Sequence, residues 1–240
     1  MAIVGAMDEE IAALLPCLDH ARRERRAGRD FHLGRLDGHD VVLVRCGIGK
    51  VAAATTAAVL LDAFGVGALV FTGVAGGLGA QVRVGDIVVA TSLLQHDMDA
   101  QPLFPRWEVP LTGRARFAAD AAWTARVVHA CQALAATGAH AAQAAVHAGL
   151  VVSGDRFVAT RAESDVLRAA LPDALAVEME GAAVAQVCHD FGRPFAVVRT
   201  VSDRADDAAH GDFARFVATV AAPYSRDIVR ATLAAVEAGR

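Results

Sequence analysis

Residues 195–203 read Phe-Ala-Val-Val-Arg-Thr-Val-Ser-Asp, an apolar run that ends in polar side chains. Residues 174–180, Ala-Leu-Ala-Val-Glu-Met-Glu, repeat this arrangement and lead into a helical pattern that starts at Gly181. Near-continuous apolar runs of this length are typical of strands buried on both faces of a parallel sheet. Such sheets bind ligands at the carboxyl ends of their strands. The two runs therefore predict an α/β fold with a polar site at the edge where these strands end.

Predicted strands and helices alternate along the rest of the chain. The strands are expected at residues 2–5, 31–36, 40–46, 68–72, 86–90, 146–152, 174–179 and 195–201, and the helices at residues 8–18, 50–64, 117–136, 161–170, 181–191 and 213–237. The strands around Asp37-Gly38-His39 are typical of a hairpin. This alternation favours one α/β domain over residues 1–240, with a central mixed, mostly parallel twisted sheet flanked by helices.

The composition excludes several classes of protein. With 240 residues, 55% hydrophobic and 21% charged, the chain can bury a full core and is unlike disordered sequences. The net charge is −4, and the short basic run at residues 22–26 is typical of a solvated surface. We therefore expect no nucleic-acid partner.

The cysteines and the apolar segments predict a cytoplasmic protein. The four cysteines show no CxxC spacing and no secretory signal precedes them, so we expect reduced thiols. Residues 63–82 carry no charge and match a membrane span in length, but they contain six glycines. A buried strand followed by a glycine-rich turn explains this stretch, so we expect no membrane partner.

Two glycine-rich stretches do not match nucleotide-binding loops. Residues 47–50 (Gly-Ile-Gly-Lys) lack the rest of the phosphate-loop motif, and residues 73–79 lack the dinucleotide-binding order. The second stretch predicts a turn at a strand end where the backbone, at Ala75 and Gly76, approaches a small ligand closely. His96-Asp97-Met98-Asp99 has no second His or Cys cluster to complete a metal site, so we expect neither a metal nor a cofactor.

Acidic residues follow three of the predicted strands. Cleavage of an N-glycosidic bond needs an acid for the leaving group and a base for the water. Asp203, beside Ser202 at a strand end, is a candidate acid, and Glu10 shares an inward helical face with Met7. Residue type alone leaves two other interpretations open. An aspartate at this place is often a helix cap, and a glutamate in a first helical turn is favoured there by the helix dipole.

Four motifs occur in order along the chain, at residues 5–10 (Gly-Ala-Met-Asp-Glu-Glu), 152–157 (Val-Ser-Gly-Asp-Arg-Phe), 177–180 (Val-Glu-Met-Glu) and 198–203 (Val-Arg-Thr-Val-Ser-Asp). Together they resemble the methylthioadenosine/S-adenosylhomocysteine nucleosidases of the purine nucleoside and uridine phosphorylase superfamily. The resemblance runs nearly end to end. It implies hydrolysis of a 5′-thio-substituted adenosine with release of adenine.

The resemblance also implies a role for each matching residue. Asp203 would protonate adenine at N7, Glu10 would activate the water, and Glu180 would hold the ribose hydroxyls. The other implied contacts are those of Phe157 and the Val158 backbone with adenine, of Met7, Met179 and Glu178 around the ribose, of Ile48 and Phe213 with the 5′ substituent, and of Arg199 with the water. Val74 departs from the family pattern, because many relatives place a serine there that touches the water.

The residues leave three alternatives open. A nucleoside phosphorylase would need a cationic cradle for phosphate, whereas Asp8-Glu9-Glu10 would repel an anion at that place. An aminodeoxyfutalosine nucleosidase would keep the chemistry and change the 5′ substituent. A non-catalytic adenosine-binding protein would not need a base that activates water.

Residues 91–116 predict an interface. This segment lacks clear periodicity, holds three of the seven prolines, and carries large apolar side chains such as Leu103 and Phe104. Exposed apolar segments of this kind are typical of interfaces, and two-fold dimers are the commonest soluble oligomers. Relatives of the family it resembles dimerise and use the matching loop to close the 5′ end of the pocket, which implies a homodimer in which Leu103 or Phe104 contributes to the partner's pocket.

Overall fold

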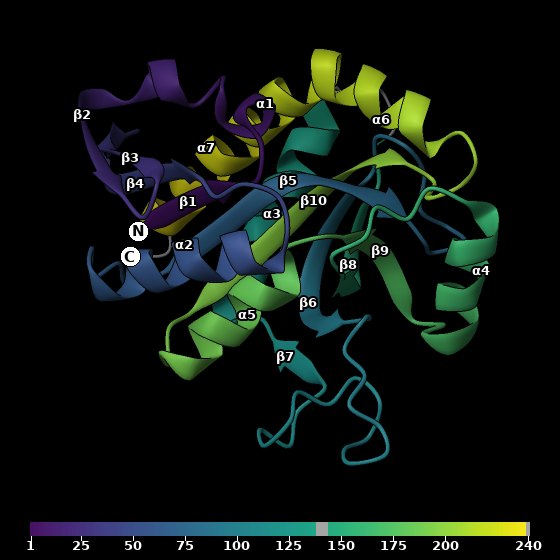
Figure 1. Ribbon diagram of the computed structural model, residues 1–240. Helices are drawn as coiled ribbons and strands as arrows, with labels where there is room; N and C mark the ends of the chain where they lie inside the picture. The colour runs from purple at the N-terminus through teal and green to yellow at the C-terminus, as the bar shows by residue number, and fades with distance from the viewer. Residues whose placement is uncertain (138–143, 239–240) are drawn as a thin grey trace.

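A computed structural model describes residues 1–137 and 144–238, and it has an α/β architecture (Figure 1). The strands are β1 (Ala2–Gly5), β2 (Asp19–Arg26), β3 (Arg29–Leu36), β4 (His39–Arg45), β5 (Leu69–Gly77), β6 (Ile87–Gln95), β7 (Arg116–Ala118), β8 (Val146–Ser153), β9 (Ala174–Glu178) and β10 (Phe195–Asp203). The helices are α1 (Asp8–Ile11), α2 (Lys50–Asp62), α3 (Ala121–Thr137), α4 (Arg161–Ala170), α5 (Gly181–Asp190), α6 (Ala209–Phe216) and α7 (Ala222–Ala238).

The strands form one mixed sheet, as the sequence predicted. One parallel array joins β4, β1, β5 and β10, and a second joins β6, β8 and β9. Antiparallel pairing of β10 with β6 and of β5 with β9 connects the two arrays. Strands β5, β10, β6, β8 and β9 therefore close into a ring, and the β2–β3–β4 hairpins extend the sheet beyond it.

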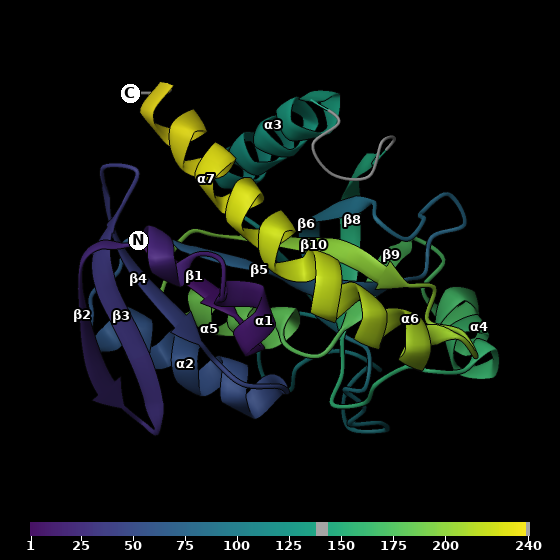
Figure 2. The same ribbon diagram turned by 90° about the horizontal axis from the view of Figure 1, so that it is seen from above.

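Helices cover both faces of the sheet (Figures 1 and 2). On one face α2 packs beside α5, and their small and aliphatic side chains join the largest apolar cluster of the core. On the other face α7 lies beside α3, and Tyr224 and Ile228 pack with Val127 and Cys131 against β6 and β10. The cavity described below lies at the strand ends, outside these two packed layers.

The carboxyl ends of three strands converge at Gly76. Its register partners are Asp203 on β10 and Val177 on β9. A Cβ at this position would lie 2.9 Å from Oδ1 of Asp203. Glycine is therefore required for the strand ends to approach so closely. The fold thus brings the polar residues that follow β9 and β10 to one place.

The predicted helix over residues 8–18 is wrong in length. Helix α1 ends at Ile11, and a short 3₁₀ turn (η1) covers Leu15–Cys17. Pro16 explains the break, because it has no N–H and its ring clashes with the preceding helical turn.

Two strands were missed. Strand β2 lies at the sheet edge with nearly all side chains exposed, so it lacks the alternation that marks a half-buried strand. Its arginines at 22, 23, 25 and 26 are exposed, as expected for a solvated basic run. Strand β7 has three residues and occupies the start of the helix predicted at 117–136.

Two helices begin elsewhere than predicted. Helix α3 starts at Ala121, because Asp120 accepts the N–H of Trp123 through its side chain and that of Thr124 through its carbonyl. The helix predicted at 213–237 begins earlier, as α6, and a π-helical segment (η2, Val217–Ala221) joins it to α7. An extra residue in the helical turn was not visible in the sequence pattern.

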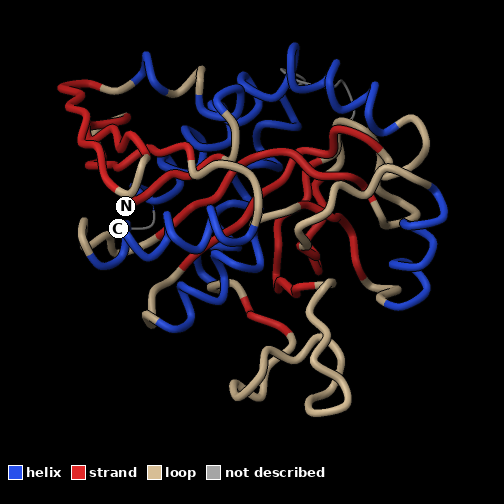
Figure 3. The backbone as a smooth tube through the Cα atoms, viewed as in Figure 1, coloured by secondary structure: helices blue, strands red, loops and turns tan. Residues whose placement is uncertain are grey.

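Strands β5 and β6 are longer than predicted. The glycine-rich stretch from residue 73 continues as strand to Gly77, so the predicted turn begins later. Strand β6 runs to Gln95, which shortens the irregular segment to residues 96–115. This loop extends away from the sheet (Figures 1 and 3). In the described part of the chain, no helix has the length and hydropathy of a membrane span.

Candidate active site

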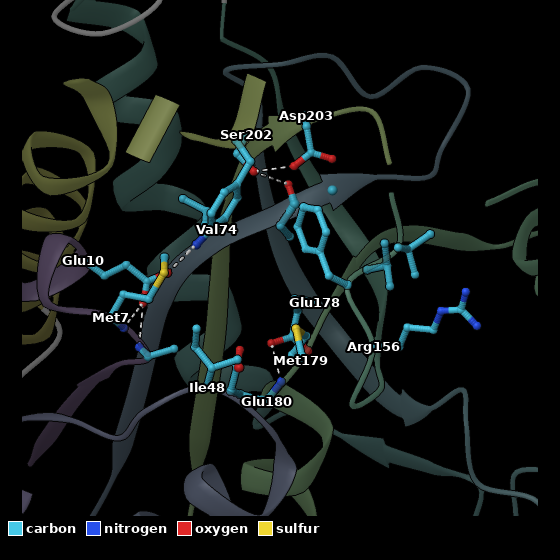
Figure 4. A pocket seen from close by; sticks show the side chains of 17 residues that line it. Met7, Glu10, Ile48, Val74, Arg156, Glu178, Met179, Glu180, Ser202 and Asp203 are labelled. Atoms are coloured by element: carbon cyan, nitrogen blue, oxygen red, sulfur yellow. Dashed lines mark hydrogen bonds between the residues drawn. The ribbon is translucent and has the colours of Figure 1, made fainter. Parts of the chain in front are cut away.

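A cavity of about 360 Å³ lies where β5, β9 and β10 end (Figure 4). This volume is within the range of small-molecule binding sites. The residues that line it are Ala6, Met7, Glu10, Ile48, Val74, Ala75, Gly76, Arg156, Phe157, Val158, Val177, Glu178, Met179, Glu180, Ser202, Asp203 and Phe213.

The cavity unites nearly all the residues that the sequence placed in a site. Only Arg199 and Leu103 of that set do not line it. Arg199 is buried behind the cavity wall, whereas the Leu103 residue is 84% exposed on the loop 96–115. The expected contact of Leu103 with substrate involves a second copy of the chain, so it stays a prediction.

Glu10 lies on α1 and its side chain reaches back to the ends of β1 and β5. Oε2 accepts the N–H of Ala6 at 2.6 Å and of Met7 at 3.0 Å, and Oε1 accepts that of Val74 at 3.0 Å. Burial raises the pKa of Glu10, while Arg199 and these three N–H groups oppose the rise. A fixed carboxyl group with a raised pKa is suited to accept a proton from water.

Gly73 leaves a space between Glu10 and Arg199. A Cβ at this position would clash with Oε1 of Glu10 and would lie 3.0 Å from Nη1 of Arg199. Among the described residues, Nη1 and Nε of Arg199 have no hydrogen-bond acceptor. A guanidinium donor and a carboxylate acceptor therefore face the same small space. The backbone N–H of Val74 is bound to Glu10.

Arg199 and Glu178 form a buried ion pair beneath the cavity. Nη2 of Arg199 donates to Oε2 of Glu178 at 2.7 Å, and the guanidinium stacks on the ring of Phe71 with 4.0 Å to the centroid. Glu178 also accepts the N–H groups of Glu180 and Gly181 and the hydroxyl of Ser153. These donors occupy both oxygens of Glu178. Glu178 therefore stabilises the cavity wall next to the expected ribose site, and both of its carboxylate oxygens are bound within the protein.

Glu180 presents its carboxyl to the cavity at the start of α5. Oε1 accepts the N–H of Gly49 at 2.8 Å, which ties this residue to the loop before α2. Burial, and then the charge of Glu178, raise the pKa of Glu180 to about 8. Three carboxyl groups, those of Glu178, Glu10 and Glu180, thus interact with one arginine, Arg199.

Asp203 lines a different side of the cavity from Glu10 (Figure 4). It is 1% exposed. Oδ1 accepts the N–H of Ala205 at 2.8 Å, and Oδ2 accepts the hydroxyl of Ser202 at 2.8 Å. An acidic side chain and a potential base thus lie on different sides of a space that accommodates a small molecule.

Apolar side chains form the remaining walls. The rings of Phe157 and Phe213 meet edge to face with 5.4 Å between centroids. Phe157 is 39% exposed and Ile48 is 58% exposed, so both reach the mouth of the cavity. An aromatic wall of this kind is suited to a flat heterocyclic ring.

Three lining residues were not in the predicted set: Ala6, Arg156 and Val177. Each adjoins a predicted residue in the chain and lies inside a motif already recognised. No chemical signal distinguished them, because Ala6 and Val177 are small apolar residues. Arg156 is largely exposed and pairs with Glu163 at the mouth. Among the described residues, no group of three potential metal ligands gathers.

The raised pKa of Glu180 predicts a pH-dependent effect of Glu180→Gln on stability. Below pH 4.5 the side chain of Glu180 is protonated in both the folded and the unfolded chain, so the stability of wild type and of the variant should change alike with pH. Between pH 4.5 and 8 the unfolded chain ionises first, so the wild type loses stability that the variant keeps. Thermal unfolding from pH 4 to 9 should show the variant gaining on the order of a few kcal/mol relative to wild type, with a plateau at high pH.

Glu9→Gln supplies the matched control, because Glu9 is the exposed neighbour of Glu10. The difference in stability between Glu9→Gln and wild type should stay nearly constant with pH. A constant difference for Glu180→Gln as well would contradict the raised pKa of Glu180.

Comparisons with known proteins agree with this geometry. Residues 1–234 match the phosphorylase superfamily. The 5′-methylthioadenosine/S-adenosylhomocysteine nucleosidase of Anoxybacillus flavithermus is 39% identical over 96% of each chain. The crystal structure of such a nucleosidase from Neisseria meningitidis in complex with methylthio-immucillin-A is 36% identical, with a TM-score of 0.89 and 97% of each chain covered. A futalosine hydrolase mutant of Helicobacter pylori is 29% identical, with a TM-score of 0.85, over 100% of this chain and 98% of that one.

These matches and the ordered motifs lead to one conclusion. The chain belongs to the phosphorylase superfamily and, within it, to the family of 5′-methylthioadenosine/S-adenosylhomocysteine nucleosidases.

Proposed function

We propose that this protein hydrolyses the N-glycosidic bond of 5′-methylthioadenosine and S-adenosylhomocysteine, releasing adenine and the 5-thio-substituted ribose. The observation that carries the proposal is the placement of Glu10 and Asp203 on different sides of one cavity, which Glu180 also lines (Figure 4). The names of the relatives supply the substrate class. The proposed reaction uses the protein's own side chains, without a metal or cofactor.

Asp203 is the proposed general acid. Departure of adenine as an anion is unfavourable, so a proton delivered to N7 makes the base a neutral leaving group. The contacts with Ser202 and with the N–H of Ala205 fix the carboxyl at the cavity wall. A fixed orientation keeps the acid in line with the purine edge.

Glu10 is the proposed base. A water bound in the space at Gly73 would accept from Arg199 Nη1 and donate to Glu10, which aims it at the anomeric carbon. Glu10 takes the proton as the carbon–oxygen bond forms and the carbon–nitrogen bond breaks. The three backbone N–H groups on Glu10 keep its carboxyl in place during this transfer.

Glu180 is proposed to hold the ribose. Its carboxyl accepts from the 2′ and 3′ hydroxyls, and its charge stabilises the oxocarbenium-like sugar of the transition state. Met7 and Met179 would pack on the sugar, while Phe157 would stack on adenine and the Val158 backbone would read its N1 and N6 edge. Ile48 and Phe213 would contact the 5′ group.

One alternative substrate has a specific observation in its favour. The similarity to a futalosine hydrolase supports an aminodeoxyfutalosine-type nucleoside with the same bond cleaved. The phosphorylase alternative is disfavoured by charge, because Arg156 is the one cation among the described residues that line the cavity, and it lies at the mouth. Phosphate would need a cationic cradle beside the sugar.

We further propose a cytoplasmic homodimer without nucleic-acid or membrane partners. All four cysteines are free thiols, which suits a reducing compartment. Leu103 and Leu111 are 84% and 91% exposed on the loop 96–115. A dimer would bury these side chains and bring one protomer's loop to the mouth of its partner's cavity.

The reaction is tested by adenine release in the absence of phosphate. Purified protein should release adenine from methylthioadenosine and S-adenosylhomocysteine, with inosine as a poor substrate and aminodeoxyfutalosine as the test of the alternative. Added phosphate should leave the rate unchanged. Strict dependence on phosphate, with a ribose 1-phosphate product, would show a phosphorylase instead.

The residue roles are tested by two variants that keep side-chain shape. Asp203→Asn and Glu10→Gln should each lower kcat by about 10²–10⁴-fold, because each loses a proton-transfer group. Glu10→Gln should still bind a transition-state analogue, since the sugar and base contacts remain. Glu9→Gln is the control with normal turnover, and near-wild-type rates in Asp203→Asn or Glu10→Gln would refute the roles.

The dimer is tested by sedimentation. The protein should sediment at twice the 24.9 kDa chain mass. Leu103→Glu should shift it toward monomer and raise KM, because a charge would enter the apolar interface. Val166→Glu, which changes an exposed valine on α4, should stay dimeric. A fully active monomeric wild type would remove this proposal.

A further inference from the structure

Arg168 lies outside the cavity, on α4, and its guanidinium contacts the ends of two strands. Nε donates to the carbonyl of Leu78 at 2.9 Å. Nη2 donates to the carbonyls of Gly77 at 3.4 Å and Arg204 at 3.2 Å. Figure 1 shows α4 beside the end of the sheet where β9 and β10 terminate. One side chain therefore bridges the residues that follow β5 and β10.

These carbonyls belong to residues adjacent to the cavity wall. Gly77 follows Gly76, and Arg204 follows Asp203, the proposed acid. Gly76 and Asp203 are register partners at the end of the β5–β10 ladder. The guanidinium of Arg168 thus binds carbonyls one residue beyond Gly76 and Asp203, the pair that forms this side of the cavity.

The bridge lies next to a β-bulge. Val201 pairs with Ala75 and Asp203 pairs with Gly76, so Ser202 is an extra residue on β10. Bulges interrupt the regular ladder and re-aim the side chains that follow. The carbonyls beyond the bulge then need other donors, because an unpaired backbone carbonyl away from water is costly. Arg168 supplies these donors as a planar fork, which fixes direction as well as distance.

We propose that Arg168 is a positioning residue for the general acid. It holds the bulged end of β10 against the end of β5, so that Asp203 reaches N7 of the bound base. The inference rests on the proposed function. Without the fork, the carbonyl of Arg204, next to Asp203, loses its bond to α4, and the carboxyl moves from its line to the purine. A displacement of about 1 Å is enough to reduce catalysis by roughly 100-fold.

Arg161 provides a matched control on the same helix. Both arginines pair with Asp165, Arg161 at 3.8 Å and Arg168 at 3.1 Å. The side chain of Arg161 is 78% exposed, whereas that of Arg168 is 30% exposed. Arg161→Met therefore removes a cation and an ion pair to the same aspartate, and in the described part of the chain no side-chain hydrogen bond joins Arg161 to a strand end.

The test separates proton delivery from binding. Arg168→Met, Arg168→Lys and Arg161→Met are compared with wild type for kcat on methylthioadenosine. The same proteins are titrated with 5′-methylthiotubercidin, in which carbon replaces N7, so its affinity does not depend on a proton from Asp203. We expect Arg168→Met to lower kcat by about 10- to 100-fold. Its affinity for methylthiotubercidin should stay within about 3-fold of wild type, and Arg161→Met should match wild type in both measurements.

Arg168→Lys keeps the charge without the fork, so its kcat should fall between those of wild type and Arg168→Met. This variant decides the question if Arg168→Met does not fold. Unchanged kcat, or an equal loss of kcat and of methylthiotubercidin affinity, would overturn the inference, because the second result marks general damage to the cavity. Failure of the wild type to release adenine would instead refute the proposed function.

Discussion

The buried charge of Arg199 is the interaction on which the site depends. Its guanidinium lies inside the closed ring of strands, stacked on Phe71 and bonded to Glu178. A buried cation is tolerated only when paired and hydrogen-bonded, so Glu178 must stay where it is. Glu178 in turn accepts the N–H groups of Glu180 and Gly181, which fixes the start of α5. The orientation of Glu180 toward the cavity therefore follows from the pairing of Arg199.

This arrangement leaves an imbalance of charge that suits cation chemistry. Glu10, Glu178 and Glu180 surround one arginine, and their repulsion together with burial raises the pKa of Glu180 to about 8. Glu180 therefore holds a proton at neutral pH. A sugar that develops positive charge supplies the missing cation, so the carboxylates become more favourable partners as the glycosidic bond breaks. The same imbalance would repel phosphate, and this links the hydrolytic proposal to the electrostatics of the wall.

The sequence predicted the site better than the edges of the fold. Strand β10 is buried along its whole length and begins with an apolar run, and its polar end lies at the cavity, so its position could be inferred from composition alone. Strand β2 was missed because its side chains are solvated. The antiparallel closure of β5 on β9 was also out of reach, since it depends on a close approach at Gly76 between distant segments. The role proposed for Arg168 could not be predicted from the sequence, because its side chain binds backbone carbonyls. Its neighbours in the chain are typical of an ordinary helix surface.

Glycine explains why fold and site coincide. At Gly76 the absent side chain lets three strand ends meet, and at Gly73 it leaves the space between Glu10 and Arg199. A methyl group at either position would push apart the groups that the proposed reaction needs together. Gly76 therefore allows the strand ends to meet, and Gly73 allows Glu10 and Arg199 to lie close together. Strand β5 accordingly runs through both glycines, where the sequence had suggested a turn: Gly73 lies against Glu10, the proposed base, and Gly76 lies against Asp203, the proposed acid.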